Sequence, residues 1–277
     1  EPGQTVTSPF LNGIPATNSS TGDVRIEFYA AIRTPEPFLP AGTVIAREQT
    51  YVHTFHKEDA PKQAFAGSEE DDRQIVFSGP HFKATFDKQS GLLVSYRYKK
   101  QEFIHNGQCP RPFFWRAPTD NDYGAKLPIR LKAWKEASYQ EPKAESFNVV
   151  RDKDTTAVKV TYRFPQTDAR WDITYKVYGN GVIKVDNHFV AENAQTPMIP
   201  RVGLRMQLPA RITSLTYYGR GPEENYRDRR TSQFIGEYTS GIQDMYEPYV
   251  RPQENNHRTD IYWCTLTSKA KEGLLFV

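Results

Sequence analysis

The sequence predicts an all-β protein built from antiparallel sheets, and three observations support this prediction. Apolar and polar side chains alternate with a period of two over most of the chain, as in strands with one buried and one solvated face. Asn180-Gly181 separates two such alternating runs, which is the strongest short-range signal for a β-hairpin. Only residues 127–138 show helical spacing, with Leu131 and Trp134 on one face.

The expected elements follow one another along the chain with turn residues between them. Alternating runs predict strands at residues 24–32, 82–86, 92–98, 158–164, 171–177, 183–189 and 202–208. The polar segment 87–91 predicts a hairpin turn, and Leu127 to Ser138 is the one short helix. Segment 58–72 is polar and contains Pro61 and Gly67, so it predicts a linker between two β units.

The charge balance excludes several classes of partner. The chain has 36 Lys and Arg against 33 Asp and Glu, a formal net charge of +3. This gives little attraction for nucleic acid or an anionic membrane, so we expect neither as a partner. No run approaches the roughly twenty apolar residues of a bilayer span, which predicts a soluble protein, cytoplasmic or periplasmic.

The densest basic patch is interrupted by acidic residues and is interpreted as an ion-pair network of Arg220, Arg227, Arg229 and Arg230 with Glu223, Glu224 and Asp228.

Cysteine use and metal motifs are sparse. Cys109 and Cys264 lie far apart in a chain large enough to need no disulfide, so we expect two thiols. None of the zinc or EF-hand spacings occurs, and no cofactor is predicted for this chain. Asp120, Asn121 and Asp122 are consecutive oxygen donors, but neighbours on a strand or turn point apart, so a calcium site is not expected there.

Residues 113–124, FFWRAPTDNDYG, begin with three bulky aromatic rings, which are followed by an arginine and a polar cluster. This mixture suits a sugar, which presents apolar C–H faces and a rim of hydroxyl groups. The alternative is a structural loop in which Arg116 neutralises Asp120 or Asp122 while the aromatic rings fill the core. We expect Arg116 to be substantially buried, paired with one of these carboxylates, and stacked on a neighbouring aromatic ring.

This motif resembles the Arg-Ala-Pro-x-Asp-Asn-Asp signature near the start of the last domain of large bacterial β-galactosidases of glycoside hydrolase family 2. Residues 219–229, GRGPEENYRDR, resemble that family's Gly-x-Gly-Pro-x-Glu-Asn-Tyr-x-Asp-Arg, and residues 244–255, DMYEPYVRPQEN, resemble its Asp-Met-Tyr-x-Pro-Tyr-x-x-Pro-x-Glu-Asn. Three long, dissimilar motifs in the same order are far more specific than one glycine pattern. The resemblance departs at Asn256-His257, where many members carry Gly-Asn.

The resemblance implies a domain plan. Residues 73–277 would form an antiparallel β-supersandwich like that of galactose mutarotases. Residues 1–57 would be the end of an immunoglobulin-like β-sandwich, with 58–72 as the linker. The sequence ends on the apolar run 274–277, and because a domain rarely ends on a buried strand, we expect the supersandwich to continue further.

The resemblance also implies a function. Retaining glycosidases need two carboxylates, and in this family both are glutamates on a (β/α)₈ barrel that precedes the segment. We therefore expect a non-catalytic C-terminal portion of a β-galactosidase, inactive alone, that shapes the sugar pocket beside the barrel. The implied partners are a galactoside, that barrel and further copies of the parent in a homo-oligomer. Any Mg²⁺ and Na⁺ of the parent would lie in the barrel.

Polar residues of the three motifs are the candidates for the sugar pocket or the barrel-facing rim, because sandwich folds usually carry function on loops. They are Arg116, Asp120, Asn121, Asp122, Glu224, Asn225, Arg229, Glu254 and Asn255. No catalytic residue is predicted, although a carboxylate pair would arise if folding joined two of Asp120, Asp122, Glu224 and Glu254. The core, rather than a stacking platform for sugar, is the expected place of Tyr226, Tyr246, Tyr249 and Trp263.

Two other functions stay open on the sequence. One is a stand-alone galactoside-binding module. The other is a mutarotase-like epimerase, which uses histidines and a glutamate as general acid and base. Its candidates are His105, His188, Glu254 and His257, although each histidine is expected to be a surface or hydrogen-bonded strand residue.

Overall fold

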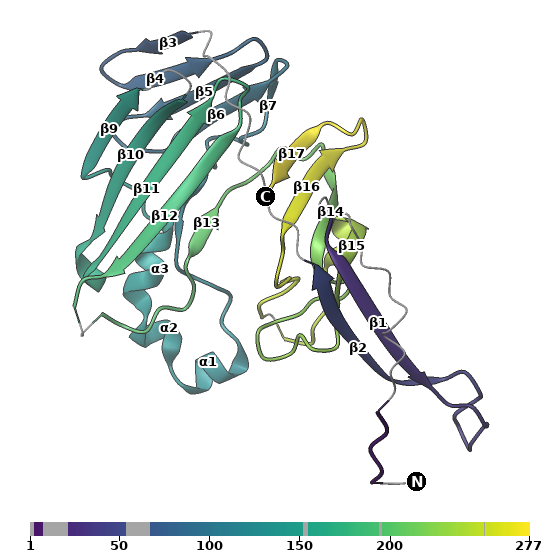
Figure 1. The fold of residues 1–277 in the computed structure, drawn as a ribbon. Helices are drawn as coiled ribbons and strands as arrows, with labels where there is room; N and C mark the ends of the chain where they lie inside the picture. The colour runs from purple at the N-terminus through teal and green to yellow at the C-terminus, as the bar shows by residue number, and fades with distance from the viewer. Residues whose placement is uncertain (1–2, 8–21, 54–66, 152–154, 194–195, 252) are drawn as a thin grey trace. The chain divides into compact units, whose positions relative to one another are not determined.

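The computed structural model describes residues 3–7, 22–53, 67–151, 155–193, 196–251 and 253–277 (Figure 1). The chain divides into two compact units, Glu1–Asp59 and Ala60–Val277. In the first, β1 (Val24–Ala31) and β2 (Val44–His53) form an antiparallel hairpin, which confirms the strand expected at residues 24–32. The immunoglobulin-like assignment of residues 1–57 stays a prediction.

The second unit contains two larger antiparallel sheets that face each other in Figure 1. The first has the order β3-β4-β5-β6-β7 and comprises Gly67–Glu70, Gln74–Ser78, Phe82–Asp87, Leu93–Tyr98 and Gln101–Glu102. The second has the order β12-β11-β10-β9, in which β9 to β12 are Ser146–Arg151, Thr155–Phe164, Ala169–Tyr178 and Ile183–Ala191. These strands confirm the predicted hairpins at 82–98 and 171–189.

Alternation fills the space between these sheets with aromatic and branched side chains. Every second residue of β11 is buried, from Ala169 through Tyr175 to Val177, because successive side chains point to opposite faces. Phe86 of β5 meets Tyr175 across the core with ring centroids 5.2 Å apart. The all-β, antiparallel fold class is therefore confirmed.

The predicted linker needs a correction. Residues 67–70 form strand β3, which pairs with β4 at the edge of the five-stranded sheet. The backbone hydrogen bonds of β4 stabilise this polar segment as a strand although its sequence has no apolar alternation. Residues 58–66 lie outside the described residues, so the domain boundaries themselves stay predictions.

Three short helices follow β8 (Arg111–Phe113): α1 (Asp120–Gly124), α2 (Leu127–Arg130) and α3 (Lys132–Tyr139). The predicted helix at 127–138 is therefore present but interrupted at Leu131, whose φ and ψ of −110° and 21° leave the helical range. Trp134 is fully buried, as its helical spacing indicated. Helix α1 was not predicted.

The remaining strands carry the loops of the other two sequence motifs. A four-stranded sheet has the order β15-β14-β16-β17, with β14 to β17 at Ile212–Gly221, Phe234–Gly241, Trp263–Ser268 and Gly273–Phe276. The strand predicted at 202–208 shortens to β13 (Gly203–Arg205), which pairs with β8. Two 3₁₀ turns, η2 (Pro165–Thr167) and η3 (Gln243–Met245), complete the described elements.

Two further expectations concern the whole chain. Both Cys109 and Cys264 are free thiols, as predicted, and burial raises the pKa of each above its ordinary value. The longest helix, α3, has eight residues, and no helix in the described part of the chain could cross a membrane.

Candidate functional site

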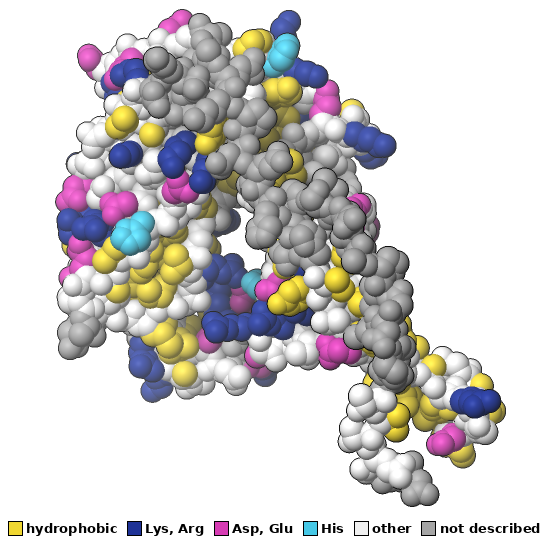
Figure 2. All heavy atoms as spheres, in the orientation of Figure 1, with side chains coloured by type: hydrophobic (Ala, Val, Ile, Leu, Met, Phe, Trp, Pro, Cys, Tyr) yellow, Lys and Arg dark blue, Asp and Glu magenta, His cyan; other side chains and the backbone are white. Residues whose placement is uncertain are grey.

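Arg116 joins two of the sequence motifs. Its Nη2 donates to both oxygens of Asp122, at 2.8 and 2.9 Å, and its Nη1 lies 3.3 Å from Oε2 of Glu254. The side chains of Asp122 and Glu254 are 10% and 12% exposed, and that of Arg116 is 33% exposed. Figure 2 shows acidic and basic side chains gathered between α1 and the loops of the β14–β15 sheet. The structure thus brings together three of the predicted site residues.

The local sequence places Asp122 for this contact. Thr119 is the N-cap of α1, and its hydroxyl accepts from the Asp122 amide at 3.3 Å. Asp122 in turn accepts from the Thr119 amide at 3.0 Å, which completes a capping box. Asp122 therefore holds the helix start and the guanidinium of Arg116 at once, and the loop is fixed on both sides.

Arg201 is a member of this cluster that sequence reasoning missed. Its Nη2 contacts Oε1 of Glu254, so Glu254 lies between two guanidinium groups. Burial, and then the nearby Arg116 cation, lower the pKa of Arg201 from its ordinary value. The Glu254 carboxylate, which contacts both guanidinium groups, offsets the repulsion between these two partly exposed cations. We name Arg116, Arg201, Asp122 and Glu254 the arginine cluster.

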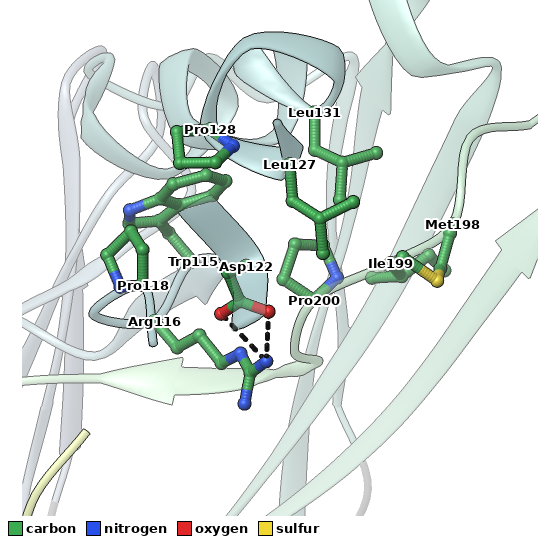
Figure 3. Close-up of a pocket in the computed structure, with 10 residues that line it drawn as sticks. All are labelled: Trp115, Arg116, Pro118, Asp122, Leu127, Pro128, Leu131, Met198, Ile199 and Pro200. Atoms are coloured by element: carbon green, nitrogen blue, oxygen red, sulfur yellow. Dashed lines mark hydrogen bonds and ion pairs between the residues drawn. The ribbon is translucent and has the colours of Figure 1, made fainter. Parts of the chain in front are cut away.

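A pocket of about 130 Å³ opens beside the arginine cluster (Figure 3). The Arg116–Asp122 ion pair forms one edge. The walls are apolar and consist of Trp115, Pro118, Leu127, Pro128, Leu131, Met198, Ile199 and Pro200. Such a surface offers stacking and methylene contacts on one side and a charged hydrogen-bonding edge on the other.

The aromatic residues of the first motif do not stack on Arg116, contrary to prediction. Phe114 is fully buried and packs against Trp134 at 4.9 Å between ring centroids. The cation near the Trp115 ring is Lys135, with Nζ 6.0 Å from the centroid. The rings therefore fill the core, since burying them there gains more apolar contact than a half-exposed guanidinium would offer. Arg116 is of intermediate burial, with 33% of its side chain exposed, and its predicted pairing with Asp122 is confirmed.

Glu224 is the centre of a second cluster. Its Oε1 accepts from Nη2 of Arg229 at 2.5 Å and contacts the hydroxyl of Tyr249. Its Oε2 accepts from the amide of Asn256 at 2.8 Å. The guanidinium of Arg229 also lies 4.5 Å from the ring centroid of Tyr226, close enough for a cation–π contact. The carboxylate thus joins the loop after β14 to the loop before β16.

Asn225 and Asn255 hold the same loops from inside. Asn225 is fully buried, and its Oδ1 accepts from both the amide and the hydroxyl of Thr259, at 2.9 and 2.6 Å. Asn255 exchanges hydrogen bonds with the backbone of Glu247, accepting at 3.1 Å and donating at 2.6 Å. The Asn225 amide also donates to the carbonyls of Arg220 and Glu223 and is saturated, whereas Asn255 makes one donated and one accepted bond; both residues hold loops in this structure.

Asp120 and Asn121 lie on the solvent side of α1. Both residues are exposed, and Asp120 makes a weak ion pair with Arg251 at 3.4 Å. Because the helix turns Asp122 inward, the three consecutive oxygen donors point in different directions. Among the described residues, no group of three or more His, Cys, Asp or Glu side chains is placed to hold a metal ion.

The predicted tyrosine core and arginine network also need correction. Tyr246 is 70% exposed, because it lies on the outer side of a loop. The other three aromatic residues, Tyr226, Tyr249 and Trp263, are half-buried and not in the core. The basic patch does form ion pairs, but Arg220 and Arg230 both pair with Asp260, which was not among the predicted partners.

The carboxylates and histidines do not assemble a catalytic pair in the described structure. Asp122 and Glu254 are each bound to guanidinium groups, whereas a glycosidase needs one carboxyl that protonates a leaving group. His188 is 74% exposed on β12, and His257 hydrogen-bonds the carbonyl of Asn225 from a loop. No contact among the described residues joins these histidines to Glu254.

Comparisons with known proteins agree with the motifs. Residues 78–276 match the family described as the beta-galactosidase small chain. The chain is 31% identical to a beta-galactosidase of Streptococcus thermophilus and 30% identical to one of Lactobacillus delbrueckii subsp. bulgaricus, in both cases over all of this chain and 26% of the relative. It is 34% identical to a beta-galactosidase of Priestia megaterium over 75% of this chain and 20% of the relative. The chain therefore spans about a quarter or less of these relatives' length and belongs to the beta-galactosidase small chain family.

Proposed function

We propose that this chain is the non-catalytic C-terminal portion of a β-galactosidase that hydrolyses terminal β-D-galactosides. The observation that carries the proposal is the family match over residues 78–276, together with relatives named beta-galactosidase that are about four times as long. The carboxylates of Asp122, Glu224 and Glu254 are all ion-paired with arginines, which supports the proposal that this portion is not catalytic. Two catalytic glutamates on a preceding (β/α)₈ barrel would supply the chemistry by a retaining mechanism.

In this proposal, the arginine cluster shapes the rim of the sugar pocket. Arg116 and Glu254 connect the α1 motif with the loop before β16, and Arg201 connects the segment before β13. Three segments distant in sequence are thereby held in one arrangement, which is what a positioned rim requires. The exposed side chains of Asn121 and of Asp120, which pairs only weakly with Arg251, are the groups accessible to a galactoside or the barrel.

Exposed apolar side chains support a barrel-facing surface. They lie on the elements that carry the arginine cluster or flank it, and each is at least 60% exposed: Tyr123, Ile129, Met198, Tyr246 and Val250. Large exposed apolar groups on one side of a domain indicate an interface. We propose that the barrel of the same polypeptide covers them.

Finer assignments belong to the same proposal. We place the enzyme in glycoside hydrolase family 2 and residues 73–277 in a galactose-mutarotase-like supersandwich, on the strength of the three motifs and the facing sheets. Mg²⁺ and Na⁺ would bind in the barrel, and the parent would form a homo-oligomer. The comparisons do not favour a stand-alone binding module or an epimerase.

The test uses both this chain and the full-length parent enzyme. The purified chain should release no nitrophenol from nitrophenyl β-galactoside, and the parent should. In the parent, Arg116→Ala should raise the galactose inhibition constant about tenfold, equivalent to about 1.4 kcal/mol, because the rim loses its anchor. Arg163→Ala, which removes two exposed ion pairs on β10, with Glu145 and Glu192, is the matched control and should leave the inhibition constant unchanged.

Two results would contradict the proposal. One is turnover by the isolated chain that Glu224→Gln or Glu254→Gln abolishes, which would place catalysis here. The other is an inhibition constant that Arg116→Ala and Arg163→Ala leave equally unaltered.

A further inference from the structure

A second, strongly basic pocket lies on the five-stranded sheet, away from the arginine cluster. It encloses about 460 Å³ where β5 begins and β6 turns into β7. Figure 2 shows basic side chains beside a histidine at this end of the sheet, at the top of the view near its middle. Five of its eight lining residues are basic or histidine, and none is acidic: His81, Lys83, Arg97, Lys99 and Lys100.

Two of these cations face each other across the sheet. Lys83 of β5 and Arg97 of β6 are direct cross-strand partners. Like charges in that position repel each other and destabilise a sheet unless something neutralises them. Glu102 lies 3.5 Å from Arg97 and offsets its charge, while it also accepts hydrogen bonds from the Ser95 hydroxyl and three backbone amides. In the described part of the chain, no carboxylate pairs with Lys83.

The other two lysines occupy the turn. Lys99 and Lys100 form the two-residue connection between β6 and β7, with φ of +45° and +69°. Two positive φ values in such a turn are typical of type I′ hairpins, which strongly favour Asn-Gly. Lysine there is strained, and strain of this kind is tolerated at binding sites. The Lys99 ammonium group is held over the Tyr98 ring, 5.8 Å from its centroid.

We propose that this basic pocket binds a phosphate or sulfate group carried by a molecule of monosaccharide size. An anion would neutralise Lys83 beside the cross-strand Arg97, and the lysines on the turn would bind it from a third side. The volume exceeds that needed by one tetrahedral anion and falls within the usual range for small-molecule sites. Gly79, Pro80 and the buried Phe82 complete the lining.

Calorimetric titration of the full chain would test this proposal. Galactose 6-phosphate, galactose 6-sulfate and inorganic phosphate are the probes, with neutral galactose as the uncharged comparison. We expect binding of both charged sugars, weaker binding of inorganic phosphate and none of galactose at this pocket. The affinity should fall as salt rises, because the contacts are ionic.

Variants separate binding from stability. Lys83→Gln/Arg97→Gln should weaken binding by about tenfold, because it removes two charge-assisted contacts. Lys99→Asn/Lys100→Gly should also weaken binding but raise the unfolding midpoint, because it restores the preferred turn sequence. The matched control, Lys269→Asn/Lys271→Gly, changes two lysines of the β16–β17 turn, one with φ of +59°, and should leave binding unaltered.

The proposal fails if neither charged sugar binds the folded chain. It fails equally if the control pair weakens binding as much as Lys83→Gln/Arg97→Gln, because the attraction would then be a general effect of net charge. Equal binding of galactose and its phosphate would also overturn it.

Discussion

Replacing Arg116 with alanine tests how much the arginine cluster stabilises the fold. An exposed ion pair is worth under about 1 kcal/mol, whereas breaking a buried pair costs about 3–5 kcal/mol. Arg116 lies between these limits, because its own side chain is 33% exposed while Asp122 is 10% exposed. Asp122 keeps its bond from Thr119, and Glu254 keeps Arg201, so neither carboxylate loses every partner. We therefore expect a loss of about 2 kcal/mol.

Urea denaturation, followed by tryptophan fluorescence, would measure this loss. A double-mutant cycle with Asp122→Ala should return a coupling energy of about 1–2 kcal/mol, since the pair shares two short bonds. Arg251→Ala is the control, because its pair with Asp120 spans 3.4 Å between mostly exposed side chains, and it should cost under about 0.5 kcal/mol. Equal losses for Arg116→Ala and Arg251→Ala, or no coupling, would refute the reasoning.

Two other predictions concern the sandwich. Gly91→Ala should destabilise the fold by more than about 3 kcal/mol, because φ is +72° and the new methyl group would lie 2.8 Å from the buried Tyr162 hydroxyl. Gly107 has a similar φ of +70° but open space around it, so Gly107→Ala should cost only about 1 kcal/mol. Thermal unfolding of both variants would measure the difference. Burial raises the pKa of Tyr96 to about 12, so the free energy of unfolding should fall as pH rises from about 10 to about 12. Tyr96→Phe should remove this residue's part of the dependence of stability on pH. The same pH dependence in the variant and the original chain would contradict the prediction.

The hairpins were predictable because two local signals agreed. In β11 and β12, alternation gives the face and Gly179-Asn180-Gly181 gives the place of the turn. The loop has three residues between Tyr178 and Val182 rather than the two of a type I′ turn, so the exact register did not follow from Asn180-Gly181. Strand β3 had neither signal, since Gly-Ser-Glu-Glu is polar throughout and becomes a strand by pairing with β4. Its structure depends on a neighbour rather than on its own residues.

Helix α1 shows a signal that was present in the sequence and not used. Thr119 and Asp122 have the spacing of a capping box, which predicts a helix start at Asp120. With that helix, Asp122 turns inward and Asp120 outward, which decides which carboxylate meets Arg116. Arg201 carried no comparable signal, because its role depends on a carboxylate 53 residues later in the sequence.

The partial exposure of Arg116 links its stability effect to the proposed interface. If the barrel of the parent covers the arginine cluster, water leaves the guanidinium and its attraction to Asp122 and Glu254 grows, since the local dielectric constant falls. Removing Arg116 would then leave the negative charges of Asp122 and Glu254 with less hydration to replace the lost ion pair. The same substitution should therefore cost more in the parent than the roughly 2 kcal/mol expected in this chain, whereas Arg163→Ala, on the solvated face of β10, should cost the same in both. A larger loss in the parent is what an interface at this cluster requires, and an equal loss would place the barrel elsewhere.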